Sequence, residues 1–178
     1  MLAKDKKGYI SYEIKIGSKK LISSGPILSL QVYSEINKVP TAIIILRDGN
    51  PNLQDFELSS EKYMNPGESV EISLGYEGKN KLLFKGVITS HSIKASQLFG
   101  SHVRIECKHE IYKMTVGRKV RYFEKKDDKK ILSSIFNENG LKSTNLSGAF
   151  LNHDSFLQYD ISDWDFLMLR CSLNSKIV

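Results

Sequence analysis

The sequence is short of the residues and runs that mark several protein classes. It contains two cysteines, Cys107 and Cys171, and four prolines in 178 residues, which excludes a disulfide scaffold and a proline-rich linker. Both cysteines are expected to be buried thiols in a protein made in a reducing compartment. The longest apolar run, Ala42 to Leu46, ends at Arg47 and is far shorter than the roughly 20 residues that cross a bilayer.

The N-terminal stretch gives no sign of export by a signal peptide. Residues Met1 to Gly8 carry several charges and lack the apolar segment of about 7–15 residues that a secretory signal needs. We therefore expect synthesis in the cytoplasm without a signal peptide. Hydrophobic residues make up 40% and charged residues 26% of the chain, which is typical of a globular protein with an ordinary core.

Familiar enzyme motifs are absent as well. The sequence has no P-loop, no dinucleotide-binding glycine motif, no nucleophile elbow and no His-Glu-x-x-His pair. Cys107, His109 and His102 are a weak metal candidate, because in a strand His102 points away from the other two and zinc needs three or four converging ligands. Cys171 has no histidine near it in sequence, so we do not expect a nucleophile there. We expect no enzyme and no cofactor or metal.

The net charge of +6 is concentrated in one part of the chain. Between Ser101 and Phe150 there are 11 Lys and Arg against 6 Asp and Glu. We expect Arg118, Lys119 and Arg121 to form a basic surface that faces a protein partner. A basic β-barrel module that binds nucleic acid is the alternative, although acidic residues interrupt the run and no aromatic ladder accompanies it.

The first 110 residues alternate with the period of β-strands. Gly86, inside one of these segments, indicates a bulge or sharp bend. Strands are expected over residues 9–16, 20–22, 27–36, 41–47, 70–76, 82–88 and 101–109. The apolar side of the resulting antiparallel barrel is expected to hold Val32, Ile43, Ile45, Ile72, Leu74, Ile88, Val103 and Ile105.

The pattern then changes to that of helices. A helix is expected after Asp127 or Asp128 and to end at Gly140, because apolar residues there repeat at three and four positions. A second helix is expected to begin at a capping box, with Trp164 packing inward. The residues that cap and dock this helix are expected to be Ser162, Asp163, Trp164, Asp165 and Phe166. Asp160, Asp163 and Asp165 could instead form a carboxylate site, but acidic residues in a first helical turn ordinarily stabilise the helix.

Several short strings, taken in order, resemble the N-terminal part of the VgrG-type spike proteins, related to the phage late control D family. Tyr159 to Phe166, with its Ser-Asp-Trp-Asp-Phe core, is the most diagnostic. The others are Ile36 to Ala42, Gly49, Asn65 to Gly67, Phe84 to Gly86 and Met114 to Lys119. Such proteins are hubs of contractile injection systems, meaning type VI secretion systems, phage tails and related extracellular particles.

The resemblance implies both a fold and partners. It implies a mainly β protein with helices (α+β), in which a small antiparallel barrel like that of phage tail tubes spans residues 1–112. A basic and helical connecting region follows over residues 113–178. The chain is expected to be a fragment of a longer protein. The implied partners are two further copies in a homotrimer, tail-tube and baseplate proteins, and an effector or spike-tip protein. The particle would be secreted or extracellular after firing.

Overall fold

The structure is a computed structural model that describes residues 8–17, 19–21, 27–49, 64–96, 100–141 and 146–178. The chain divides into two compact units. Unit 1 consists of residues 1–34 and 40–109, and unit 2 of residues 35–39 and 110–178. The sequence from Leu53 to Met64 is less regular and predicts a short helix or loop, and all of it except Met64 lies outside the described residues.

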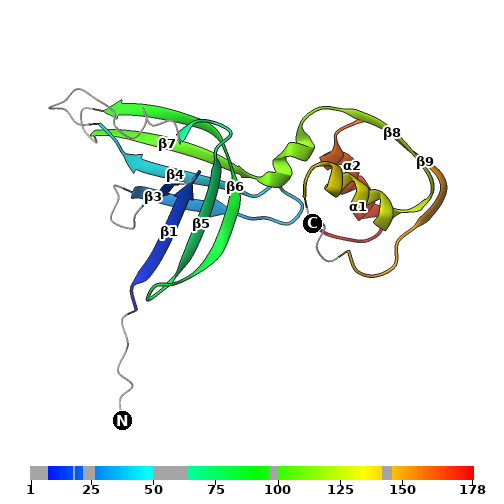
Figure 1. Ribbon diagram of the computed structural model, residues 1–178, viewed down its shortest axis with the longest axis horizontal. Coiled ribbons are helices and arrows are strands. Elements are labelled where there is room, and N and C mark those ends of the chain that lie inside the picture. Colours follow the sequence, from blue (N-terminus) through cyan, green and yellow to red (C-terminus); the bar gives the residue numbers. More distant parts are fainter. Residues whose placement is uncertain (1–7, 18, 22–26, 50–63, 97–99, 142–145) are drawn as a thin grey trace, which may run out of the picture. The chain divides into compact units, whose positions relative to one another are not determined.

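Unit 1 is one curled antiparallel sheet of seven strands (Figure 1). The strand order is β2-β1-β5-β6-β7-β4-β3, so β2 and β3 form the two edges in the described part of the chain. The mainly β fold with a few helices is confirmed. The strands are β1 (Ile10–Ile16), β2 (Lys19–Leu21), β3 (Ile27–Tyr33), β4 (Thr41–Arg47), β5 (Ser69–Tyr76), β6 (Lys79–Ser96) and β7 (Gly100–His109).

The concave side of this sheet is filled by aliphatic residues from alternate positions. In β7 the expected face is confirmed, since Val103, Ile105 and Cys107 are all buried. In β4 the expected face is wrong: Ala42, Ile44 and Leu46 are buried, whereas Ile43 and Ile45 are half-buried on the other side. Because β-branched residues occupy both faces of β4, the sequence pattern does not show which face packs in the core.

Gly86 does not mark a bulge. It pairs in register with Val70 and His109, and the register shifts of β6 fall elsewhere, opposite the step from Ile72 to Ser73 and between Ile88 and Ser90. A Cβ atom at Gly86 would lie 2.2 Å from the carbonyl oxygen of Lys108. The glycine therefore permits a close approach of two backbones.

Unit 2 contains a second, two-stranded sheet and two helices. Figure 1 shows β8 and β9 curving around α1 and α2. The 3₁₀ helix η2 (Glu110–Thr115) leads into β8 (Lys119–Asp127), which pairs antiparallel with β9 (Asn152–Ile161). The helices are α1 (Asp128–Glu138) and α2 (Asp163–Leu173).

Both helices begin where the sequence indicates, and α1 also ends where it indicates. The Asp127 side chain accepts from the backbone N–H of Lys130 at 2.7 Å and caps α1. Gly140, with φ of +70°, provides the left-handed residue that follows this helix. Ser162 is the N-cap of α2, and its Oγ accepts from the backbone N–H of Asp165 at 3.0 Å.

Among the residues expected to dock α2, Phe166 is buried more deeply than Trp164. Phe166 is buried in the core of unit 2, and its ring lies 6.3 Å from that of Phe123 and 5.9 Å from that of Phe156, centroid to centroid. Leu167 and Cys171 are also buried, whereas Trp164 is only half-buried at the margin of this core. Both aromatic residues therefore pack against this core, and Phe166 is the more deeply buried of the two.

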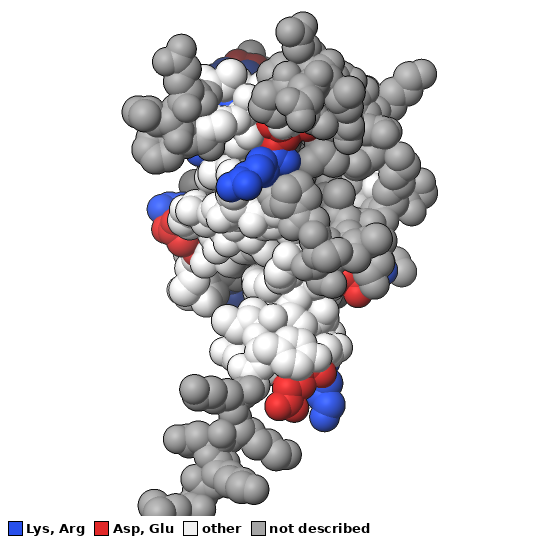
Figure 2. All heavy atoms as spheres, turned by 90° about the vertical axis from the view of Figure 1, so that its left-hand side faces the viewer, with Lys and Arg blue, Asp and Glu red and all other residues white. Residues whose placement is uncertain are grey.

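No helix among the described residues is long and apolar enough to span a membrane. Figure 2 shows one face of the molecule, on which the described Lys, Arg, Asp and Glu side chains form small, separate groups between uncharged residues.

Candidate functional site

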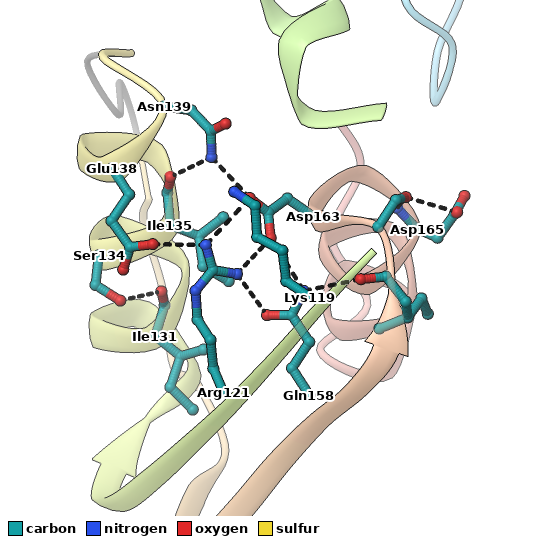
Figure 3. Close-up of polar contacts among 12 residues, drawn as sticks. Lys119, Arg121, Ile131, Ser134, Ile135, Glu138, Asn139, Gln158, Asp163 and Asp165 are labelled. Carbon is teal, nitrogen blue, oxygen red and sulfur yellow. Dashed lines mark hydrogen bonds and ion pairs between the residues drawn. The ribbon is translucent and has the colours of Figure 1, made fainter. Parts of the chain in front are cut away.

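The polar centre of unit 2 is the carboxylate of Asp163, at the first residue of α2. Figure 3 shows side chains from β8, from β9 and from Asn139, the residue after α1, converging on it. Lys119 Nζ lies 2.7 Å from Asp163 Oδ2, and Arg121 forms an ion pair with Oδ1. Asn139 donates to Oδ2 at 2.8 Å and Gln158 to Oδ1 at 3.0 Å. Four donors therefore satisfy a carboxylate that is only 1% exposed.

The local structure explains why these side chains meet. Lys119 and Arg121 alternate with outward-facing residues in β8, so both point to the inner side of the strand pair. Arg121 continues to Glu138 of α1, with Nη2 to Oε2 at 2.5 Å. Arg121 thus links β8 to both helices.

The electrostatics of Asp163 follow from these contacts. Burial would raise the pKa of its carboxyl, but hydrogen bonds from Arg121, Lys119, Asn139 and Gln158 outweigh burial and hold the pKa well below its ordinary value. The hydrogen bond to Asp163 in turn raises the pKa of Arg121. The carboxylate is permanently charged at neutral pH and fully engaged, which suits a positioning role rather than proton transfer.

A second buried network surrounds Asp128, the first residue of α1. Arg170 of α2 donates to both carboxylate oxygens, at 2.7 and 2.6 Å. Asn174 donates at 2.7 Å, and His153 Nε2 lies 3.2 Å from Asp128 Oδ1 and 2.7 Å from Arg170 Nη2. The Arg170 guanidinium also stacks 4.2 Å from the centroid of Phe156. Although burial opposes it, hydrogen bonding from Arg170, Asn174 and His153 lowers the pKa of Asp128.

Arg118 stands apart from these networks. Its side chain is 70% exposed, and it pairs with Asp160, which is 58% exposed, at 2.9 Å. The two residues border a hollow of about 320 Å³ that also touches Ser162 and Asp165. Of the three basic residues expected to form a partner-facing surface, Arg118 is therefore the exposed one, while Arg121 is directed at Asp163.

The other sequence candidates are scattered. Asp163 is buried, whereas Asp160 is exposed and Asp165 is engaged by the Ser162 hydroxyl at 2.6 Å. Cys107 lies in the core of unit 1, where burial first and Glu106 second raise the pKa of its thiol to about 12. Burial and Asp128 likewise raise the pKa of Cys171. Within the described ranges, no three His, Cys, Asp or Glu side chains are placed to hold a metal ion.

Sequence reasoning missed most of this centre. The sequence indicates Asp128 only as a possible helix cap and Arg170 only as the residue that follows the VgrG-like string, and it does not predict a role for His153 or Gln158 or the strands β8 and β9. The signal that could have found the strands is the alternation in Val120-Arg-Tyr-Phe123 and Phe156-Leu-Gln-Tyr159, which places one polar and one aromatic residue on the same side of each strand.

The fold of both units together matches solved tail proteins. One is the E. coli c3393 protein, a component of the type VI secretion system with structural similarity to the T4 bacteriophage tail proteins gp27 and gp5; the TM-score is 0.56 and the identity 12%, over 95% of this chain and 41% of that one. A tail protein from Neisseria meningitidis MC58 matches with a TM-score of 0.61 and 12% identity, over 92% and 45% of the two chains. The 43 kDa tail protein of prophage MuSo2 from Shewanella oneidensis matches with a TM-score of 0.63 and 9% identity, over 93% and 50%.

These matches define a fold class, that of phage tail proteins. The chain spans half or less of the length of these three structures. The chain belongs to the Alg8 N-terminal domain family, whose sequence profile matches residues 6–178. No curated protein sequence matches it.

Proposed function

We propose that this chain is a structural part of the spike hub of a contractile injection system, where it adapts the tail tube to the spike for effector delivery. The observation that carries the proposal is the tail-protein fold, which extends over more than nine-tenths of the chain and includes both units. The VgrG-like strings along the sequence agree with it. In this proposal residues 1–112 act as the tube-like domain and residues 113–178 as the connecting region.

The chemistry of the two buried networks supports a structural role. The carboxylates of Asp163 and Asp128 are each enclosed by donors of the chain itself, so they hold β8, β9 and the helices in a fixed geometry. A part that transmits force through a particle needs such a geometry more than it needs a reactive group. Within the described residues, β2 and β3 are the edge strands of the unit 1 sheet, and an edge strand offers backbone groups to which other strands can pair.

We propose that the partners are further copies of the same protein and other parts of the particle. In the complete protein, three copies form the hub ring and contact tail-tube and baseplate proteins on one side and an effector or spike-tip protein on the other. The assembled particle is secreted or extracellular after firing. Light scattering on the complete protein tests the ring directly, and a monomer at all concentrations would contradict it.

Removal of the coding sequence from a cell that produces the particle tests the role. We expect loss of sheathed particles in electron micrographs, and their return when the gene is supplied again. An Arg170→Ala variant, which leaves Asp128 without its cation, should fail to restore particles, whereas Arg118→Lys should restore them. Normal particles in the deletion strain, with spike and tube present, would overturn the proposal.

The same purified chain distinguishes the hub from a nucleic-acid module. A nucleic-acid module binds polynucleotide with an affinity that falls steeply as salt rises. Because Lys119 and Arg121 engage Asp163, we expect only weak adsorption that disappears at moderate salt. Tight, salt-dependent binding that Arg118→Ala and Lys126→Ala weaken would favour the nucleic-acid module.

A further inference from the structure

The outward side of the β8 and β9 pair is apolar although its inner side is packed on the helices. Four side chains form this outer face: Val120, Tyr122, Leu157 and Tyr159, which are 62%, 64%, 50% and 71% exposed. Tyr122 and Leu157 are direct cross-strand partners. A sheet with one wet side normally carries polar residues there.

The inner side of the β8 and β9 pair is more polar than its outer side at the same level. The neighbouring cross-strand pair, Arg121 with Gln158, points inward and is polar, and both side chains are enclosed in the Asp163 network. At this level of the sheet the outer face is therefore more apolar than the inner one. Strands with this composition are typical of sheets that are covered on both sides.

The surroundings of the outer face favour a protein as the cover. The face holds no charge, and the exposed charges at its ends are of both signs, with Arg118 and Asp160 at one end and Glu124, Lys125, Lys126 and Asp154 at the other. A phosphate backbone or an anionic lipid surface would require a predominance of cations. An uncharged centre with two tyrosines inside a mixed rim is the usual anatomy of a protein interface.

We infer that this outer face packs against the same face of a second copy of the chain, about a two-fold axis that runs along the strands. Such an axis places β8 of one copy over β9 of the other, so that Tyr122 lies over Leu157 and Val120 over Tyr159. It also places Arg118 of each copy over Asp160 of the other. Both the apolar centre and the charged end are then self-complementary.

The area of the face sets the strength of this pairing. Tyrosines can bury roughly 150–250 Å² each, and with Val120 and Leu157 the face amounts to about 500 Å² per copy. A standard interface buries about 800 Å² per partner, so the pair is weak and concentration-dependent. A face that meets itself across a two-fold axis does not close a ring of three, so the pairing is separate from the proposed hub ring and stands or falls without it.

Sedimentation equilibrium on the 178-residue chain tests the pairing. We expect a monomer–dimer equilibrium with a Kd on the order of 10–100 µM. Threonine is polar and is common in strands, so it should be tolerated at exposed positions of β8 and β9. Tyr122→Thr and Leu157→Thr should each raise the Kd about tenfold or more. Tyr76→Thr in β5 is the matched control, because Tyr76 is 65% exposed but lies in unit 1, and it should leave the Kd unchanged.

Charge exchange tests the geometry. R118E and D160R should each dimerise several-fold less well than the wild type, since each places like charges opposite one another. An equimolar mixture of the two should associate about as well as the wild type, because Glu then faces Arg. A chain that stays monomeric at all concentrations, or a mixture that associates no better than either variant alone, overturns the inference. Circular dichroism on every variant shows whether the fold is retained.

Discussion

The two units are held together by different physics. Among its described residues, unit 1 has thirteen buried apolar residues and one buried charged or polar residue, Asp48. The described part of unit 2 has a smaller core of eight buried apolar residues and adds five buried polar or charged residues. These are Asp128, Gln158, Ser162, Asp163 and Arg170.

Buried ion pairs fix the positions of the helices around the smaller core of unit 2. Asp128 and Asp163 occupy equivalent places, each as the first residue of a helix and each behind an N-cap residue. There the helix dipole favours a negative charge, and a cation from another element completes the pair. Such pairs define where the helices begin and how they dock, whereas loss of one partner leaves an uncompensated buried charge.

Low pH should produce the largest difference in stability between the two units. The folded-state pKa values of Asp128 and Asp163 lie below the ordinary value of about 3.9. Their contribution to stability is therefore fully present above that ordinary pKa, and it is lost as the pH falls from there toward the folded-state values. We expect the only tryptophan, Trp164, to report unfolding of unit 2 between about pH 4 and pH 2.

Hydrogen exchange followed by mass spectrometry resolves the units in the same acid series. Peptides from β8, α1 and α2 should lose protection first, while peptides from β4 and β7 remain protected. Simultaneous loss of protection in both units would show that the sheet of unit 1 depends on unit 2, and would remove the contrast.

Asp163→Asn should have the next largest effect. The neutral amide leaves Lys119 and Arg121 without their shared anion, and breaking a buried pair in this way costs about 3–5 kcal/mol. Urea denaturation monitored by Trp164 fluorescence measures the loss. Asp160→Asn is the matched control, because its partner Arg118 is exposed and the loss should be about 0–1 kcal/mol. Equal effects of the two substitutions would refute the buried network.

Ile44→Ala should destabilise unit 1 instead. Ile44 is fully buried, so removal of its side chain should cost about 2–5 kcal/mol by loss of transfer energy and by formation of a cavity. Alkylation of the buried Cys107 thiol in urea follows the opening of unit 1. Ile43→Ala, in the adjacent half-buried position, should cost distinctly less. The reverse order would mean that the two sides of β4 have been exchanged.

The sequence predicts most strands of unit 1 but not their full extent, because β6 continues to Ser96 where the pattern predicts a strand over residues 82–88. Alternation of period two indicates β1, β5 and β7 because each has one wet side, and Val103, Ile105 and Cys107 are buried as predicted. It fails at β4, where Ile43, Ile44 and Ile45 are equally apolar and nothing local distinguishes the core side.

The site in unit 2 is harder to predict, for a physical reason. The partners of Asp163 and Asp128 lie up to 46 positions away in the sequence. From the sequence alone, a lysine or arginine in β8 is therefore expected at the surface, because its carboxylate partner is brought close only by the fold. The Ser162 cap, by contrast, depends on contacts within three residues and is visible in the sequence. Contacts within a few residues can therefore be predicted from the sequence, whereas ion pairs between distant residues cannot.

The smallest effect should come from this cap, and it separates local from long-range stabilisation. In Ser162→Ala the backbone N–H of Asp165 loses its acceptor, and the Asp165 carboxylate loses the hydroxyl at 2.6 Å. We expect a loss of about 0.5–2 kcal/mol by Trp164 fluorescence in urea, and recovery of most of it in Ser162→Thr. Because Ser162 precedes Asp163, a shifted helix start would also misplace the buried carboxylate. If Ser162→Ala proves as costly as Asp163→Asn, and the double variant no worse than either, the cap acts by positioning Asp163; additive losses would show that cap and network stabilise α2 independently.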